Sequence, residues 1–270
     1  MKSPSPKGAK TKTIPVLSGA VVISNIRLNA SNFILGLEPE CAMPKPRPGQ
    51  FLMFGIGKEK DPLLKRPFCY FGWGSGPKRM RLKILYRVVG KVTTLMTGLK
   101  RGDRVEILGP LGNGYPVETG GDKSKIALVI AGGVGLASVH PLRSYLGRRA
   151  HLFYGEKAGA DLLLVDRLKK TGQVTLASED GSLGFKGTAV DAARAFLHGK
   201  DKGDFILYAC GPNAMLKAAS RLGVAGYVAS EEKMACGVGV CLGCAVKTAA
   251  GFKRACKDGP VFQIGEVLFD

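Results

Sequence analysis

The sequence is poor in acidic residues: 21 Asp and Glu stand against 40 Lys and Arg in 270 residues, giving a formal net charge of +19. It also lacks a long apolar run. The longest uncharged apolar stretch, residues 126–142, is shorter than the roughly 20 residues that a membrane-spanning helix needs. The first twelve residues hold four lysines and no apolar signal-peptide core, so we interpret residues 1–13 as a disordered basic tail. These features predict a cytoplasmic protein with no membrane partner.

The composition otherwise fits an ordinary globular chain of one or two domains, with 45% hydrophobic residues. Collagen-like, disordered and coiled-coil classes are excluded. The positive charge by itself leaves open nucleic acid, an anionic surface, an acidic protein partner or a merely solvated surface. The three histidines, His140, His151 and His198, are scattered along the chain, and we predict no catalytic side chain.

The first part of the chain, residues 14–118, alternates short apolar runs with glycine and proline. This spacing is typical of an antiparallel β-barrel or sandwich. Strands are predicted over residues 20–26, 33–37, 50–54, 68–72, 82–88 and 104–108. A polar, glycine-rich stretch at residues 119–125 is predicted to be a linker.

The pattern changes after this linker. Residues 126–130 form a continuous apolar run, as in a strand buried on both faces, and glycines and a helical stretch follow. Strands and helices then alternate, which predicts a parallel sheet with helices on its faces over residues 125–228. The further predicted strands are residues 151–154, 174–177 and 205–209, and the helices are residues 161–170, 190–197 and 213–222. Residues 229–270 form a separate segment rich in cysteine and glycine.

Four cysteines of this last segment follow the spacing C-x4-C-x2-C, with a fourth further on: Cys236, Cys241, Cys244 and Cys256. This is the spacing of plant-type [2Fe–2S] ferredoxins, and intervening glycines let the backbone approach a cluster closely. A four-cysteine zinc site is the other interpretation, but it usually has two C-x2-C pairs. The seven cysteines form an odd number, which fits a reducing compartment better than a disulfide framework. Cys41, Cys69 and Cys210 are interpreted as small buried hydrophobic residues.

Glycine turns follow two of the predicted buried strands, at Gly132, Gly133 and Gly135 and at Cys210-Gly211-Pro212. A strand, a glycine turn and a helix form a phosphate-binding arrangement, although a plain tight turn has the same pattern. In the first part, Arg66 offers a cation for a diphosphate and Phe68 a ring for a planar heterocycle. Taken alone, those residues are better explained by an ordinary strand with one exposed arginine.

Taken in order, these segments resemble the ferredoxin–NADP⁺ reductase superfamily. Within it the chain is similar to the electron-transfer subunits of class 1B dihydroorotate dehydrogenase. The resemblance runs from about residue 14 to the C-terminus, and its most specific parts are residues 231–244 and 256–262. It implies a barrel that binds FAD, an α/β domain that binds NAD⁺ and a C-terminal [2Fe–2S] module.

The resemblance also implies roles for individual residues. Arg66 would hold the FAD diphosphate, Pro67 and Phe68 would lie beside the isoalloxazine, and Cys69 would lie near flavin N5. The remaining implied contacts are Leu85, Tyr86 and Arg87 to the flavin, Val92 and Thr93 to its phosphates, Gly132, Gly133, Gly135, Cys210, Gly211 and Pro212 to NAD⁺, and Cys236, Cys241, Cys244 and Cys256 to the cluster. Two positions depart from the family pattern: Val92 replaces a usual Gly, and Ser138 follows Ala137 where Pro is usual.

The implied function is electron transfer in pyrimidine biosynthesis. A separate FMN-containing catalytic subunit would oxidise dihydroorotate, and electrons would pass through the cluster and FAD to NAD⁺, in a heterotetramer of two plus two chains. Another NAD(P)H oxidoreductase subunit, such as that of an NAD(P)H–ferredoxin oxidoreductase or sulfide dehydrogenase, would use the same cofactors. A zinc and nucleic-acid-binding protein would fit the charge and cysteines but leaves the flavin segments unexplained, so no nucleic-acid partner is expected.

Overall fold

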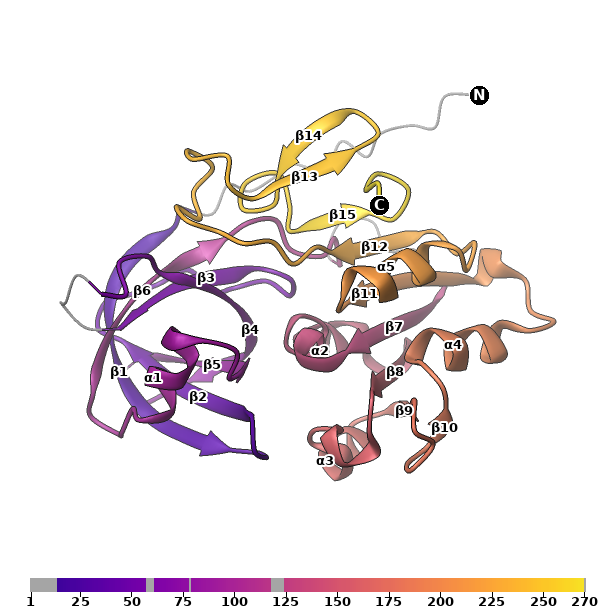
Figure 1. Ribbon diagram of the computed structural model, residues 1–270, viewed down its shortest axis with the longest axis horizontal. Helices are drawn as coiled ribbons and strands as arrows, with labels where there is room; N and C mark the ends of the chain where they lie inside the picture. The colour runs from indigo at the N-terminus through magenta and orange to yellow at the C-terminus, as the bar shows by residue number, and fades with distance from the viewer. Residues whose placement is uncertain (1–13, 57–60, 78, 118–123, 270) are drawn as a thin grey trace.

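The computed structural model describes residues 14–56, 61–77, 79–117 and 124–269 (Figure 1). The basic tail predicted at residues 1–13 and most of the predicted linker lie outside these described residues. None of the helices within the described ranges has the length and apolarity that crossing a membrane requires.

The first part folds into a closed antiparallel barrel of strand order β1-β2-β5-β4-β3-β6, as predicted. Its strands are β1 (Val16–Arg27), β2 (Asn32–Pro39), β3 (Phe51–Ile56), β4 (Arg66–Ser75), β5 (Met80–Arg87) and β6 (Arg104–Leu111). Alternate side chains fill the barrel, among them Leu35, Leu52 and Ile84, all fully buried, because successive residues of a strand face opposite sides. A short helix that the sequence analysis did not anticipate, α1 (Lys91–Thr97), follows β5 and buries Val92 and Met96 against the barrel core.

The second part is a seven-stranded sheet of order β10-β9-β8-β7-β11-β12-β15. Its strands are β7 (Ile126–Gly132), β8 (Ala150–Glu156), β9 (Gln173–Ser178), β10 (Phe185–Lys186), β11 (Phe205–Cys210), β12 (Gly226–Ala229) and β15 (Val261–Gln263). The helices are α2 (Leu136–Leu146), α3 (Val165–Lys170), α4 (Ala189–Leu197) and α5 (Asn213–Ser220). All pairings are parallel except that of β12 with β15. After β7 the chain continues to β8 on one side of β7, whereas β11 pairs with the other side of β7. Open sheets bind ligands in the crevice that such a reversal of strand order creates.

The helix predicted over residues 161–170 is wrong in its first part. Residues Gly159–Asp161 form a 3₁₀ turn, and α3 begins only at Val165 after Leu164 adopts a left-handed φ of 56°. That left-handed residue interrupts the helical path, so Asp161 lies outside the helix. The helix predicted over residues 213–222 ends at Ser220, two residues early.

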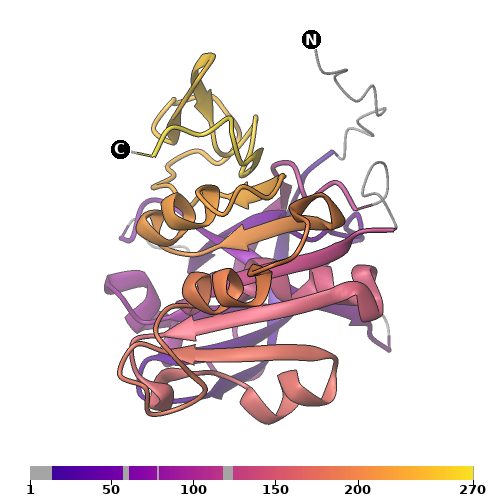
Figure 2. The ribbon, with the colours of Figure 1, turned by 90° about the vertical axis from the view of Figure 1, so that its right-hand side faces the viewer.

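The C-terminal segment folds onto both larger parts. Its strand β15 forms the edge of the sheet next to β12, and its hairpin of β13 (Ala245–Thr248) and β14 (Gly251–Arg254) lies beyond that end of the sheet (Figure 2). Cys244 and Cys256 belong to the same hydrophobic core as Met53 and Leu111 of the barrel and Leu128 of the sheet. The three parts of the described chain are therefore packed through a shared core.

Candidate functional site

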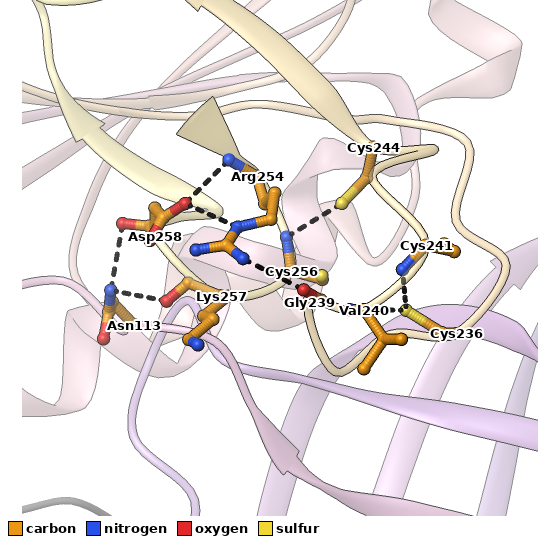
Figure 3. A network of polar contacts seen from close by, with 10 residues as sticks. All are labelled: Asn113, Cys236, Gly239, Val240, Cys241, Cys244, Arg254, Cys256, Lys257 and Asp258. Carbon is orange, nitrogen blue, oxygen red and sulfur yellow. Dashed lines mark hydrogen bonds and ion pairs between the residues drawn. The ribbon is translucent and has the colours of Figure 1, made fainter. Parts of the chain in front are cut away.

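The four predicted cluster cysteines lie together in the loops between β12 and the hairpin and after β14 (Figure 3). The backbone N–H groups of Val240 and Cys241 point at Cys236 Sγ, at 3.3 and 3.5 Å. The Cys256 N–H donates to Cys244 Sγ at 3.4 Å. Positive φ angles at Gly237 and Gly239, of 70° and 84°, turn the loop so that its N–H groups face the sulfur atoms.

The thiols differ in exposure and in acidity. Cys241 is exposed, whereas Cys244 and Cys256 are buried. Desolvation opposes ionisation of Cys236, but hydrogen bonds from the backbone N–H groups of Cys241, Val238 and Val240 outweigh it and lower the Cys236 pKa to about 6. Desolvation, together with the neighbouring Cys244, raises the pKa of Cys256 to about 12. N–H donors that stabilise a thiolate are the contacts that an iron–sulfur cluster uses, so these residues fit such a group. Within the described ranges, no three or more His, Cys, Asp or Glu side chains form a ready site for one metal ion.

A polar network fixes the cluster loop to the barrel. Asn113, which follows β6, donates from Nδ2 to the carbonyl oxygen of Asp258 at 2.9 Å (Figure 3). Asp258 in turn pairs with Arg254 at 3.1 Å, and Arg254 donates to the carbonyl oxygen of Gly239 at 3.0 Å. Gly237 lies so close to the barrel that a Cβ would stand 2.5 Å from Met53 Cγ. The loop is thus held directly against the barrel wall.

A cavity of about 520 Å³ lies between the barrel, the first glycine turn and the residues before Cys236. Ten of the residues predicted to bind FAD or NAD⁺ line it: Pro67, Phe68, Cys69, Leu85, Tyr86, Arg87, Thr93, Gly132, Gly133 and Pro212. The segment from Ser230 to Met234 forms another wall. The aromatic rings that line this cavity, and the cavity's volume, suit a planar heterocycle.

Five of the predicted cofactor residues do not line this cavity: Arg66, Val92, Gly135, Cys210 and Gly211. The Arg66 guanidinium donates to the carbonyl oxygen of Leu64 at 2.6 Å. Gly135 lies against the Cys210 backbone, where a Cβ would stand 2.3 Å from the carbonyl oxygen, so it brings α2 close to β11.

The Thr93 hydroxyl caps the turn that opens α1. It accepts hydrogen bonds from the N–H groups of Val89 and Gly90 and donates to the carbonyl oxygen of Gly90, all within 2.9–3.0 Å. The Val92 side chain faces the barrel core, so only its backbone is available to a ligand.

Cys69, which lines the cavity, and Cys210, which does not, both lie near the Ser138 hydroxyl. Burial, together with the charge of Glu231, raises the pKa of the Cys69 thiol to about 12, and the same two causes raise that of Cys210. The hydroxyl of Ser138, which stands where Pro is usual in the family that the sequence resembles, also lies 3.3 Å from the Tyr115 hydroxyl. Both thiols are therefore protonated at neutral pH.

A second cavity of about 370 Å³ opens at the carboxyl ends of β7, β8 and β9. Gly132, Gly133 and Pro212 line it as well as the first cavity. Three acidic residues also line it: Glu156, Asp161 and Glu179. The two cavities meet at Arg87, which lines both.

Glu156, Glu179 and Glu231 were not among the predicted site residues, although Glu231 begins the stretch 231–244 that carries the family resemblance. The sequence could have indicated two of them. Glu156 is the last residue of β8 and Glu179 directly follows β9, so both lie at the edge where open sheets bind ligands. Glu231 lies in the first cavity, where partial desolvation raises its pKa and the charge of Arg87 opposes the shift. Its position depends on how residues 230–234 fold back across the barrel.

Solved structures with the same arrangement are ferredoxin reductases and their relatives. The chain matches a structure described as the flavin-bifurcating NADH-dependent reduced ferredoxin-NADP oxidoreductase with a TM-score of 0.80 at 24% identity, covering 97% of this chain and 92% of that one. It matches a ferredoxin NADP⁺ reductase from Neisseria gonorrhoeae with a TM-score of 0.61 at 14% identity, covering 76% and 89%. The fold is therefore that of the ferredoxin reductases.

Sequence comparison gives the particular family. Residues 231–268 match the family model for the iron–sulfur cluster binding domain of dihydroorotate dehydrogenase B. The chain is 36% identical over 259 residues to the electron transfer subunit of dihydroorotate dehydrogenase B (NAD⁺) from Caldanaerobacter subterraneus subsp. tengcongensis, covering 93% of this chain and 98% of the relative. It is 37% identical over 235 residues to the same subunit from Desulforamulus reducens, covering 83% and 87%. The chain belongs to the family of electron transfer subunits of dihydroorotate dehydrogenase B.

Proposed function

We propose that this chain passes electrons from a dihydroorotate-oxidising catalytic subunit through a [2Fe–2S] cluster and FAD to NAD⁺. The observation that carries the proposal is the continuity of the site. Met234 lines the first cavity, and Cys236 begins the cysteine loop two residues later. At the other side of that cavity, Gly132 and Gly133 lead into the second cavity. This continuity supports a single path through three proposed binding regions.

The cysteine loop would hold the cluster through Cys236, Cys241, Cys244 and Cys256. The N–H groups of Val240, Cys241 and Cys256 stabilise negative charge on the sulfur atoms. The Asn113–Asp258–Arg254 network fixes the loop against the barrel. A bound cluster supplies one-electron transfer.

The first cavity, called the flavin cavity below, would hold the flavin ring against Phe68, Tyr86 and Cys69; the second is called the nicotinamide cavity. FAD supplies the conversion between single electrons and a hydride. The nicotinamide would approach over Gly132 and Gly133, where the absence of side chains permits close contact. Arg66, Val92 and Thr93 are proposed to contact the FAD phosphates from the barrel side, and Gly135, Cys210 and Gly211 to shape the nicotinamide loop.

The catalytic subunit would bind at the exposed end of the cysteine loop. Apolar side chains there are unusually exposed: Val240 by 79%, Leu242 by 62% and, on the neighbouring hairpin, Phe252 by 76%. Exposed apolar side chains around the exposed Cys241 suit a protein interface, and a partner bound there would lie close to the cluster. We propose a complex of two such chains with two FMN-containing catalytic chains, in the reducing environment of the cytoplasm.

The proposal is tested by co-expressing the chain with a candidate FMN subunit and measuring reduction of NAD⁺ by dihydroorotate. We expect one FAD and two iron atoms per chain, a visible spectrum of flavin plus cluster, and coupled turnover that needs both subunits. The Leu242→Glu variant should lose the partner in gel filtration while keeping the spectrum. Leu183→Glu, at another exposed leucine, 37% accessible and outside the cysteine loop, is the control.

A complex that copurifies with full cofactor content but reduces no NAD⁺ with dihydroorotate would refute the assigned electron donor. Such a complex should then be assayed with reduced ferredoxin. The family relationship favours dihydroorotate over that second donor.

A further inference from the structure

A third cavity of about 790 Å³ lies between the barrel and the sheet domain, at the end of β4 farthest from Cys69. One side is the second half of β4, and the other is α2; the two elements face each other across the middle of the molecule (Figure 1). We call it the basic cavity. None of its lining residues lines the two cavities described above, so it is a separate compartment. The two cavities use neighbouring residues of the same two elements: Phe71 and His140 line the basic cavity, and Cys69 and Ala137 line the first cavity.

The lining carries one sign of charge. Five cationic side chains reach it from separate parts of the chain: Lys45, Arg81, Lys83, Arg101 and Arg167. No Asp or Glu is among the lining residues. Of these five cations, only Arg81 has an ion pair within the described part of the chain, with Glu38 at 3.4 Å. Cations gathered in a concave site concentrate positive potential and attract a multiply charged anion.

His140 adds an aromatic surface without adding charge. Its ring stacks on Phe71 with centroids 4.2 Å apart, and Nδ1 lies 3.1 Å from the Phe71 carbonyl oxygen. Burial, then the charges of Arg167, Arg143 and Lys83, lower the His140 pKa to about 4, so the ring is neutral at pH 7. The partly exposed Tyr145 supplies a further ring in the lining.

The β4 side of the cavity is bare backbone. Gly72 and Gly74 both face open space, since a Cβ built on either meets no atom within 4 Å. Glycine inside a strand is unfavourable without a reason, and one such reason is close approach of a ligand to the backbone. The volume lies in the range of small-molecule sites, which favour domain interfaces.

We propose that the basic cavity binds a nucleoside polyphosphate. The spread of cations over β5, α3 and two loops suits several phosphate groups rather than one, and Arg and Lys are the usual phosphate partners. The neutral rings and glycine backbone suit a planar base. An acidic protein segment would not need this concave volume or the bare strand. Because the ligand would contact both β4 and α2, it would stabilise the packing of the barrel on the sheet domain.

The test is calorimetric titration of the flavin- and cluster-containing protein with ATP, in saturating NAD⁺ so that the dinucleotide site is filled. We expect one ATP per chain, weaker binding of tripolyphosphate, and still weaker binding of adenosine. Binding should weaken at least threefold in Arg167→Gln and also in Gly74→Val, whose side chain would project into the open space over the β4 backbone. Lys169→Gln removes the same charge from the same helix outside the cavity and should bind ATP as the parent does.

Several results would overturn the proposal. ATP binding that disappears in saturating NAD⁺, or that is as tight in Gly74→Val as in the parent, would place the nucleotide elsewhere. Equal affinity for tripolyphosphate and ATP would show that the cavity does not bind the base. Binding of a hexaglutamate peptide with no binding of ATP would make the cavity a protein-docking surface. If Gly74→Val loses its visible spectrum, the double variant Lys83→Gln, Arg167→Gln decides, and unchanged ATP affinity there refutes the site.

Discussion

The Arg87 guanidinium donates a 2.8 Å hydrogen bond to the Glu156 carboxylate and so joins strand β5 of the barrel to strand β8 of the sheet. The Glu156 side chain is only 8% exposed. Desolvation raises the pKa of Glu156, and the charge of Arg87 opposes that shift. Since Arg87 lines both the flavin and the nicotinamide cavities, this ion pair fixes how the two cavities meet.

The first prediction removes the charge of this pair while keeping its shape. Glu156→Gln should lower the free energy of unfolding by about 1–3 kcal/mol, because Arg87 loses a charge-assisted hydrogen bond. It should also raise the KM for NADH with flavin content unchanged. Urea unfolding and an NADH–ferricyanide assay measure the two effects. Asp61→Asn, which breaks an exposed ion pair with Lys91, is the control and should cost under about 0.5 kcal/mol. A Glu156→Gln protein as stable as the control would contradict the structural role.

The second prediction concerns the choice between NADH and NADPH. Glu156, Asp161 and Glu179 line the second cavity, and their carboxylates would repel the extra phosphate of NADPH. We expect NADH to be strongly preferred, and Glu179→Gln to reduce the ratio of kcat/KM values by about tenfold, which corresponds to roughly 1.4 kcal/mol. Asp166→Asn on α3, outside that cavity, should leave the ratio unchanged. An unaltered ratio in Glu179→Gln would show that this carboxylate does not face the ribose.

The third prediction concerns Arg66. Its guanidinium is held by the Leu64 carbonyl oxygen beside the flavin cavity and is proposed to bind the FAD diphosphate. Arg66→Ala should raise the dissociation constant for FAD at least tenfold, because a bidentate phosphate contact is lost. Arg66→Lys should restore only part of the affinity. Fluorescence of released FAD on dilution measures the loss, with Arg79→Ala as the control. Retention of FAD equal to that of the control would remove Arg66 from the site.

Much of the fold was predictable because it depends on local pattern. Short alternating runs indicated the barrel, and the apolar run of β7 indicated a buried parallel strand. Strands β12 and β15 were missed because they are short and pair only through the tertiary fold, β15 crossing from the cysteine segment to the sheet. The helix α1 was missed because Thr93 and Thr94 are poor helix formers, and its stability comes from burial of Val92 and Met96 and the Thr93 cap.

The candidate site was predictable where residues cluster in the sequence and not where they cluster only in space. The cysteine spacing was readable directly, whereas the segment from Arg66 to Cys69 gained a predicted role only through the family resemblance. The meeting of Ser138, Cys210 and Glu231 near Cys69 was not, because three separate elements bring these residues together. The basic lysines and arginines looked like surface charge, and only the packing of α2 against β4 places some of them around one cavity.

The fourth prediction uses the depressed pKa of His140. Its pKa is about 4 in the folded protein, below the ordinary value of 6.5. The unfolded chain therefore binds more protons between these values, and stability falls as pH drops from about 6.5 to 4. His140→Gln should flatten that part of the stability profile, by up to ~3 kcal/mol. Urea unfolding at pH 4.5–7.5 measures the difference, and exposed His198→Gln is the control. Identical pH profiles for the parent and His140→Gln would contradict the burial of a neutral ring.

The most direct test of the electron path is the ratio of two activities in Cys241→Ser, measured in complex with the FMN subunit. Reduction of NAD⁺ by dihydroorotate should fall at least a hundredfold, because electrons must pass the cluster. Oxidation of NADH by ferricyanide should fall less than threefold, because it needs only the flavin and nicotinamide cavities. Cys41→Ser, at a cysteine far from the loop in sequence, should change neither rate. Coupled turnover that stays at the parent rate in a Cys241→Ser complex lacking the cluster spectrum would contradict the path.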